Sequence, residues 1–141
     1  MYKTVLVPID LGQIKQGKSL VDIAMKLVES IGGNLFLLNV LPDIPGHVAA
    51  EIPDHFLKDA KNDAIKGLDE IAKNNGVGEQ ANIIVREGNI HNEILTVAED
   101  TGADLIVMAS HQPEFSDYLL GSTAARVVRH AKCSVLIARN L

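Results

Sequence analysis

Five short apolar runs, each separated from the next by a longer amphipathic segment, constrain the fold of this chain more than any other feature. The runs cover residues 4–9, 34–40, 81–86, 104–110 and 134–138, and the first is apolar on both faces, as a strand buried on both sides would be. Helix-length connections force neighbouring strands to pair in parallel through right-handed crossovers. The sequence therefore predicts an α/β fold, a doubly wound five-stranded parallel sheet of order 3-2-1-4-5 with helices on both faces.

Apolar residues in the connecting segments recur at helical spacing. Gly32 and Gly33 are expected to end the first helix, and Asn89 is expected to be the N-cap of the third. A Pro-containing loop over residues 41–53 precedes the long second helix. The positions expected to face the sheet lie within Leu20–Ile31, Leu57–Ala72 and Ile90–Ala98, and in the last helix they are Ala125, Val128 and Ala131.

Composition and charge bound the rest of the interpretation. The chain has 141 residues, of which 47% are apolar, a formal net charge of −5 and one cysteine, Cys133. This predicts a single domain over residues 1–141 that builds its core without metals or disulfides. Because the sequence has neither a clustered basic face nor a membrane-length apolar stretch, we expect a cytoplasmic protein with no nucleic-acid and no membrane partner.

The carboxyl ends of the strands are where sheets of this class bind ligands. Asp10 ends an otherwise apolar strand, and its carboxylate can either accept hydrogen bonds from ribose hydroxyls or cap the following loop. The residues that the topology brings to this edge are Pro8, Ile9 and Asp10 after the first strand, Val40 after the second, Gly88 after the third, and Met108, Ala109, His111 and Gln112 after the fourth.

A Gly-Ser-Thr sequence opens the last helix. Gly121 lets the backbone approach an anion, the N–H groups that follow point outward, and Ser122 and Thr123 add hydroxyl donors. The alternative is that Ser122 or Thr123 simply caps the helix. Neither a Walker A sequence nor GxGxxG is present, and residues 11–18 hold two glycines without P-loop spacing, which disfavours a Ras-like or dehydrogenase mechanism.

Taken together, these residues resemble the universal stress protein family over nearly the whole chain. The similarity includes the strand endings PID and NV, the EG after the third strand, the block DLIVMASH, and LLGSTAARVVRHAKCSVLIAR near the end. The ASHxP and YLLGS segments look most like the F-type bacterial members. The resemblance implies binding of ATP, or of ADP or AMP, with Mg²⁺ accompanying the phosphates. It also implies a homodimer through antiparallel pairing of the last strand, Ser134 to Ala138.

The chain departs from the glycine pattern of the ATP-binding members, which is G-x2-G-x9-G followed by Ser or Thr. The corresponding residues here are Ala109, Gln112, Gly121 and Ser122, with eight residues rather than nine before the last glycine. Carried over by position, Pro8, Ile9, Asp10 and Val40 would hold adenine and ribose, Gly88 would lie near the sugar, Met108 and Ala109 would form the floor, and His111, Gln112, Gly121, Ser122 and Thr123 would meet the phosphates.

Three functions remain open from the sequence. The leading one is an ATP-binding stress-response or regulatory protein with at most slow hydrolysis, for which no catalytic residue beyond His111 as a weak base, and no metal-ligand cluster, can be named. The lost glycines favour the second, a nucleotide-free dimeric interaction module. The third is a nucleotide hydrolase, which would need turnover that depends on His111 or Asp10.

Overall fold

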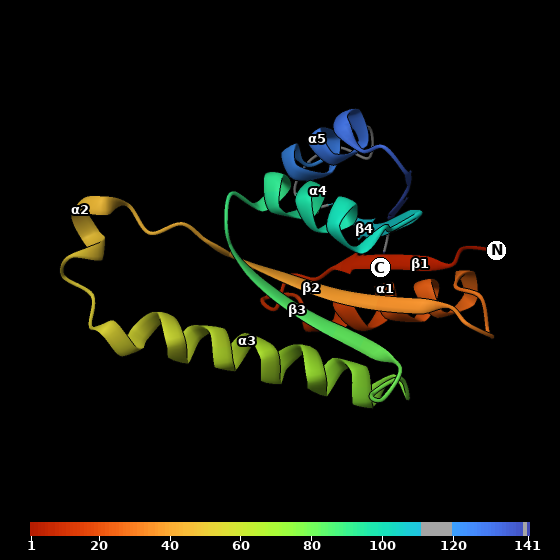
Figure 1. The fold of residues 1–141 in the computed structure, drawn as a ribbon, viewed down its shortest axis with the longest axis horizontal. Helices are drawn as coiled ribbons and strands as arrows, with labels where there is room; N and C mark the ends of the chain where they lie inside the picture. Colours follow the sequence, from red (N-terminus) through yellow and green to blue (C-terminus); the bar gives the residue numbers. More distant parts are fainter. Residues whose placement is uncertain (111–119, 140) are drawn as a thin grey trace.

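A computed structural model describes residues 1–110, 120–139 and 141, and these are the described residues below. Its single sheet has the order β3-β2-β1-β4-β5 with every neighbouring pair parallel, which confirms the predicted topology (Figure 1). The strands are β1 (Thr4–Pro8), β2 (Asn34–Pro42), β3 (Ala81–Gly88), β4 (Leu105–Ala109) and β5 (Ser134–Ala138). The helices are α1 (Ile14–Leu27), α2 (Gly46–Ala49), α3 (Asp54–Asn74), α4 (Ile90–Thr101) and α5 (Ser122–His130).

Helices cover both faces of the sheet, as the doubly wound class requires. Val5 and Val7 of β1 pack with α1 and α3, whereas Leu6 between them packs with α4 and α5. All three side chains are fully buried. Because successive strand residues point to opposite faces, β1 contributes to both cores, which explains its continuous apolar sequence.

The first helix ends earlier than the sequence predicts. α1 stops at Leu27, and Ile31 is 90% exposed rather than buried. The backbone turns extended at Val28, and the N–H of Glu29 donates to the carbonyl oxygen of Tyr2 at 2.8 Å. The chain therefore leaves the helix to pair with the segment before β1, and helical spacing beyond Leu27 has no structural meaning.

The buried face of α5 is also shifted by one residue from the prediction. Ala124 and Val127 are fully buried, whereas Val128 is 46% exposed, and only Ala131 of the predicted set packs against the core beneath α5. A shift of one residue rotates a helix face by about 100°. Because both candidate faces carry small or apolar residues, the sequence could not distinguish them.

Two more apolar side chains are less buried than expected, and one helix was missed. Leu57 is 39% exposed because the first half of α3 extends beyond the sheet together with α2, a short helix within the predicted loop (Figure 1). Ile90 is 42% exposed in the first turn of α4. No helix among the described residues combines the length and apolar character that crossing a membrane requires.

Asp104 ties the start of β4 to the start of β1. Its carboxylate oxygens accept hydrogen bonds from the backbone N–H groups of Lys3 at 3.0 Å and Thr4 at 2.9 Å. Burial alone would raise the pKa of this carboxyl, but these hydrogen bonds outweigh it, and the pKa lies below its ordinary value. A lowered folded-state pKa means that the stabilisation is present above the unfolded-state pKa and is lost as pH falls through the folded-state value.

We therefore expect Asp104→Asn to lower the free energy of unfolding by about 1 kcal/mol at pH 7, since the site is partly exposed. The difference from the wild type should shrink as pH falls below about 4, where the unfolded-state carboxyl is protonated. Urea unfolding at pH 7 and pH 3 measures both. Asp59→Asn, on an exposed part of α3, is the matched control, and a loss equal to that of the control would contradict the prediction.

Candidate functional site

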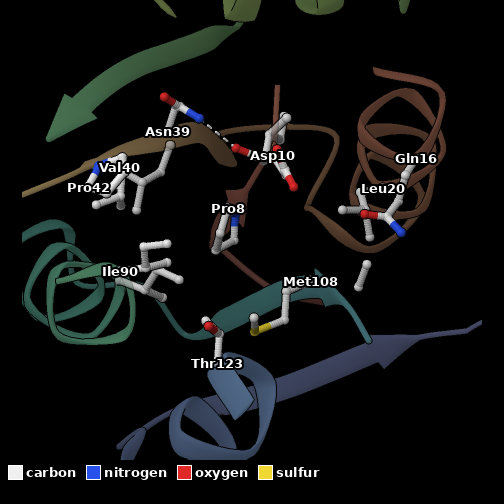
Figure 2. Close-up of a pocket in the computed structure, with 14 residues that line it drawn as sticks. Pro8, Asp10, Gln16, Leu20, Asn39, Val40, Pro42, Ile90, Met108 and Thr123 are labelled. Carbon is white, nitrogen blue, oxygen red and sulfur yellow. Dashed lines mark hydrogen bonds between the residues drawn. The ribbon is translucent and has the colours of Figure 1, made fainter. Parts of the chain in front are cut away.

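A cavity of about 280 Å³ opens at the carboxyl edge of the sheet (Figure 2). It receives side chains from three strands and three helices, so the topology itself creates it. Its volume lies just below the range of roughly 300–1,000 Å³ typical of small-molecule sites. The lining residues are Pro8, Ile9, Asp10, Gln16, Leu20, Leu38, Asn39, Val40, Pro42, Ile90, Ile94, Met108, Ala109 and Thr123.

The position of the cavity follows from the strand order. β1 pairs with β2 on one side and β4 on the other. The helix after β1 packs on one face of the sheet and the helix after β4 packs on the opposite face. The connections therefore diverge beyond the ends of β1 and β4 and leave a crevice between them, as expected at a topological switch point.

Hydrogen bonds from β2 fix the end of β1. The N–H of Ile9 donates to the carbonyl oxygen of Leu38 at 2.7 Å, and Nδ2 of Asn39 donates to the carbonyl oxygen of Ile9 at 2.9 Å. Asn39 is the one buried polar side chain among the described residues, with 9% of its surface exposed. Its buried amide therefore holds the wall of the cavity in place, a role that the sequence did not reveal.

Asp10 caps the loop that follows β1. Its Oδ1 accepts a hydrogen bond from the N–H of Gly12 at 2.8 Å, and its carbonyl oxygen accepts one from the N–H of Gln13 at 2.9 Å. The capping alternative raised by the sequence is therefore observed. Asp10 also lines the cavity, and a contact with ribose stays a prediction.

The cavity has an apolar side and a more polar side. Figure 2 shows Val40, Pro42 and Ile90 on the side formed by β2 and α4. Asp10 and Gln16 lie on the side formed by the end of β1 and by α1, with Met108 and Thr123 below. The arrangement suits a ligand with one flat apolar part and one polar part.

The structure brings most of the sequence-predicted site residues to this cavity. Those that line it are Pro8, Ile9, Asp10, Val40, Met108, Ala109 and Thr123. Gly88 does not line it, but it is the register partner of Pro42, which does, and its φ of 147° favours glycine. His111 and Gln112 lie outside the described residues.

At the start of α5, the sequence alternative in which Ser122 or Thr123 caps the helix is wrong. Gly121 is the N-cap, so Ser122 and Thr123 occupy the first helical positions and neither caps the helix. Gly121 is buried and Ser122 is exposed, and neither lines the cavity, whereas Thr123 does. The anion-binding alternative for the helix start therefore stays a prediction, carried by Thr123 and the backbone of the first turn.

Several lining residues were missed as site residues by sequence reasoning. Gln16 lies four residues before Leu20, which the helical pattern did predict to face the sheet, so the same face of α1 reaches the cavity. That spacing was the available signal for Gln16. Pro42 lines the cavity because β2 continues to Pro42, two residues beyond the predicted strand end at Val40. No local sequence pattern predicted this extension.

Sequence comparisons with known proteins point to one family over nearly the whole chain. The family described as Universal stress protein family matches residues 1–139. Universal stress protein G of Escherichia coli O157:H7 is 32% identical over 143 aligned residues, which cover 99% of this chain and 100% of the relative. Universal stress protein A homolog 2 of Coxiella burnetii is 31% identical and covers 98% of this chain and 95% of the relative.

Solved structures show the same architecture. Hypothetical protein MJ0577 superposes with a TM-score of 0.82 at 24% identity and covers 100% of this chain and 98% of its own. A universal stress protein in complex with cAMP has a TM-score of 0.71 at 22% identity, with 97% of both chains covered. One from Archaeoglobus fulgidus in complex with dAMP has a TM-score of 0.59 at 15% identity, covering 96% and 97%.

The curated relatives named above are G-type and A-type proteins, so the finer likeness to F-type members stays a prediction. The family itself follows from the match of residues 1–139 and from relatives that are about a third identical from end to end. This chain belongs to the universal stress protein family.

Proposed function

We propose that residues 1–141 form one cytoplasmic domain that binds an adenine nucleotide, with ATP as the expected ligand, in the cavity at the carboxyl edge of the sheet. The observation that carries the proposal is the cavity itself, lined from β1, β2 and β4 and the helices around them at the switch point. Complexes of related folds with cAMP and dAMP support the choice of an adenine ligand. The protein would then act as a nucleotide-binding stress-response or regulatory protein.

The two sides of the cavity suggest how the ligand would lie. The base would pack on the apolar side against Val40, Pro42 and Ile90, and the ribose would approach Asp10. The phosphates would extend toward Thr123, where the first turn of α5 offers backbone N–H groups and the positive end of its dipole. No Lys or Arg side chain lines the cavity as described, so these neutral donors would carry phosphate binding, with Mg²⁺ accompanying ATP.

Two measurements on the purified protein test this proposal. Mass spectrometry of small molecules released by denaturation should detect ATP, ADP or AMP. Calorimetric titration of the stripped protein with Mg-ATP should give a dissociation constant of about 1–100 μM, or roughly −8 to −5.5 kcal/mol. Absence of both nucleotide and heat would contradict the proposal and favour the alternative, a nucleotide-free interaction module.

We also propose that the chain forms a homodimer through β5. In the sheet of described residues, β5 is an edge strand paired with β4, and Val135, Leu136 and Ile137 are only partly buried. An apolar edge strand with open backbone groups is prone to pair with another strand unless something covers it. Antiparallel pairing with a second β5 would provide that cover.

Val135→Lys is expected to convert the dimer to a monomer, because a charge on the edge opposes strand pairing. We expect the apparent dimer dissociation constant to rise at least about 100-fold, which is about 2.7 kcal/mol. Size-exclusion chromatography with light scattering measures the mass. Val128→Lys, the same change on the exposed face of α5, should leave the dimer intact. A monomeric wild type, or equal effects of both variants, would refute this dimer.

A further inference from the structure

We propose that Gln16 is a donor to the phosphate-bearing half of the ligand, an inference that rests on the proposed function. Gln16 lies in the first turn of α1 and lines the cavity together with Leu20, four residues later on the same helix face. Figure 2 shows its amide on the polar side of the cavity, across from Val40 and Ile90. The motifs that carry the family resemblance do not include Gln16.

Among the described residues, the other polar side chains at the cavity offer few hydrogen-bond donors. Four of the described lining residues have polar side chains: Asp10, Gln16, Asn39 and Thr123. Nδ2 of Asn39 already donates to the carbonyl oxygen of Ile9, and an ionised Asp10 can only accept. Within the described chain, the Gln16 side chain makes no hydrogen bond to another residue. Its Nε2 is therefore available to a ligand, as is the hydroxyl of Thr123.

Charge favours a neutral amide at this position. Ionised phosphate oxygens only accept hydrogen bonds, and no Lys or Arg among the described residues lines the cavity. The carboxylate of Asp10 on the same side would repel a phosphate that approached without intervening donors. An amide can donate a hydrogen bond from Nε2–H to phosphate and accept one from a ribose hydroxyl at Oε1. Gln16 can therefore lie beside both the carboxylate of Asp10 and the phosphate.

Gln16→Glu tests the assignment, because it keeps the shape of the side chain and replaces the donor with a negative charge. We expect calorimetry to show affinity for AMP lowered about 30-fold and affinity for ATP lowered at least as much, with adenosine changed less than about 3-fold. Gln13→Glu makes the same change three residues earlier, at an exposed residue outside the cavity. Screening should keep its effect below about 3-fold for every ligand.

Two results with Gln16→Glu would decide against the inference. Equal losses for adenosine and AMP in Gln16→Glu would move the contact from phosphate to base or ribose and overturn it. Equal behaviour of Gln16→Glu and Gln13→Glu would show that Gln16 makes no contact. Gln16→Met, which removes the donor without adding charge, should weaken AMP binding and spare adenosine. If the wild type binds AMP and the Gln16 variants bind it equally well, only this inference fails. If the wild type binds none of the ligands, the proposed function fails.

Discussion

Val40→Trp is expected to eliminate detectable nucleotide binding while leaving the protein folded. Val40 is only partly buried and lines the apolar side of a cavity of about 280 Å³. That volume is already near the lower limit for a small-molecule site, so an indole ring would occupy the space proposed for the base. We expect affinity for ATP to fall by more than about 100-fold, equivalent to about 2.7 kcal/mol, in calorimetric titration.

Val48→Trp is the matched control for this variant. Val48 lies on α2, is 37% exposed and does not line the cavity, so the same substitution there should leave ATP affinity within about 2-fold of the wild type. Circular dichroism and a thermal melt would establish that both variants fold. If folded Val40→Trp bound ATP as tightly as the wild type, the ligand would not occupy this cavity.

Gly33→Ala is expected to be the most destabilising single-methyl substitution in the turn between α1 and β2. A Cβ at Gly33 would overlap the carbonyl oxygen of Glu29 and lie 2.9 Å from Cγ2 of Val28. The backbone there cannot shift freely, because Glu29 is hydrogen-bonded to Tyr2 and the N–H of Asn34 donates to the carbonyl oxygen of Lys3 at 2.7 Å. Relieving the overlap would therefore disturb the pairing that sets the start of β2.

We expect a loss of about 2–3 kcal/mol in the free energy of unfolding for Gly33→Ala, measured by urea denaturation. Gly46→Ala is the appropriate comparison, because a Cβ at Gly46 would meet no atom within 4 Å beyond its chain neighbours and the backbone of its own helix. That variant should stay within about 0.5 kcal/mol of the wild type. If the two alanine variants were equally stable, the turn would be more adaptable than its contacts indicate.

The sequence was most informative where one physical constraint dominated. Strands buried on both faces must be apolar throughout, so β1 and β4 could be recognised, and helix-length connections fixed their parallel pairing. Strand order and switch point then placed Pro8, Asp10 and Met108 at one edge, independently of any motif. The family resemblance is confirmed and is consistent with this fold along nearly the whole chain.

Features that depend on tertiary partners were not accessible in the same way. Ile31 continues the apolar spacing of α1, but pairing of Glu29 with Tyr2 takes the chain out of the helix first. Val128 and Val127 differ only in helix phase, which packing against the sheet decides. Asn39 gains its role from a carbonyl thirty positions earlier in the chain, and local sequence cannot reveal such a bond.

The cavity walls are made largely from the hydrophobic core itself, and this limits how the site can diverge. Leu20, Leu38 and Ile94 line the cavity and are each at most 2% exposed. Truncating such a side chain typically costs about 2–5 kcal/mol, a large share of a domain's stability. Descendants of this protein could therefore acquire new ligand preferences most readily through Gln16 or Val40, whereas changes at the core-derived walls would first require compensating stabilisation elsewhere.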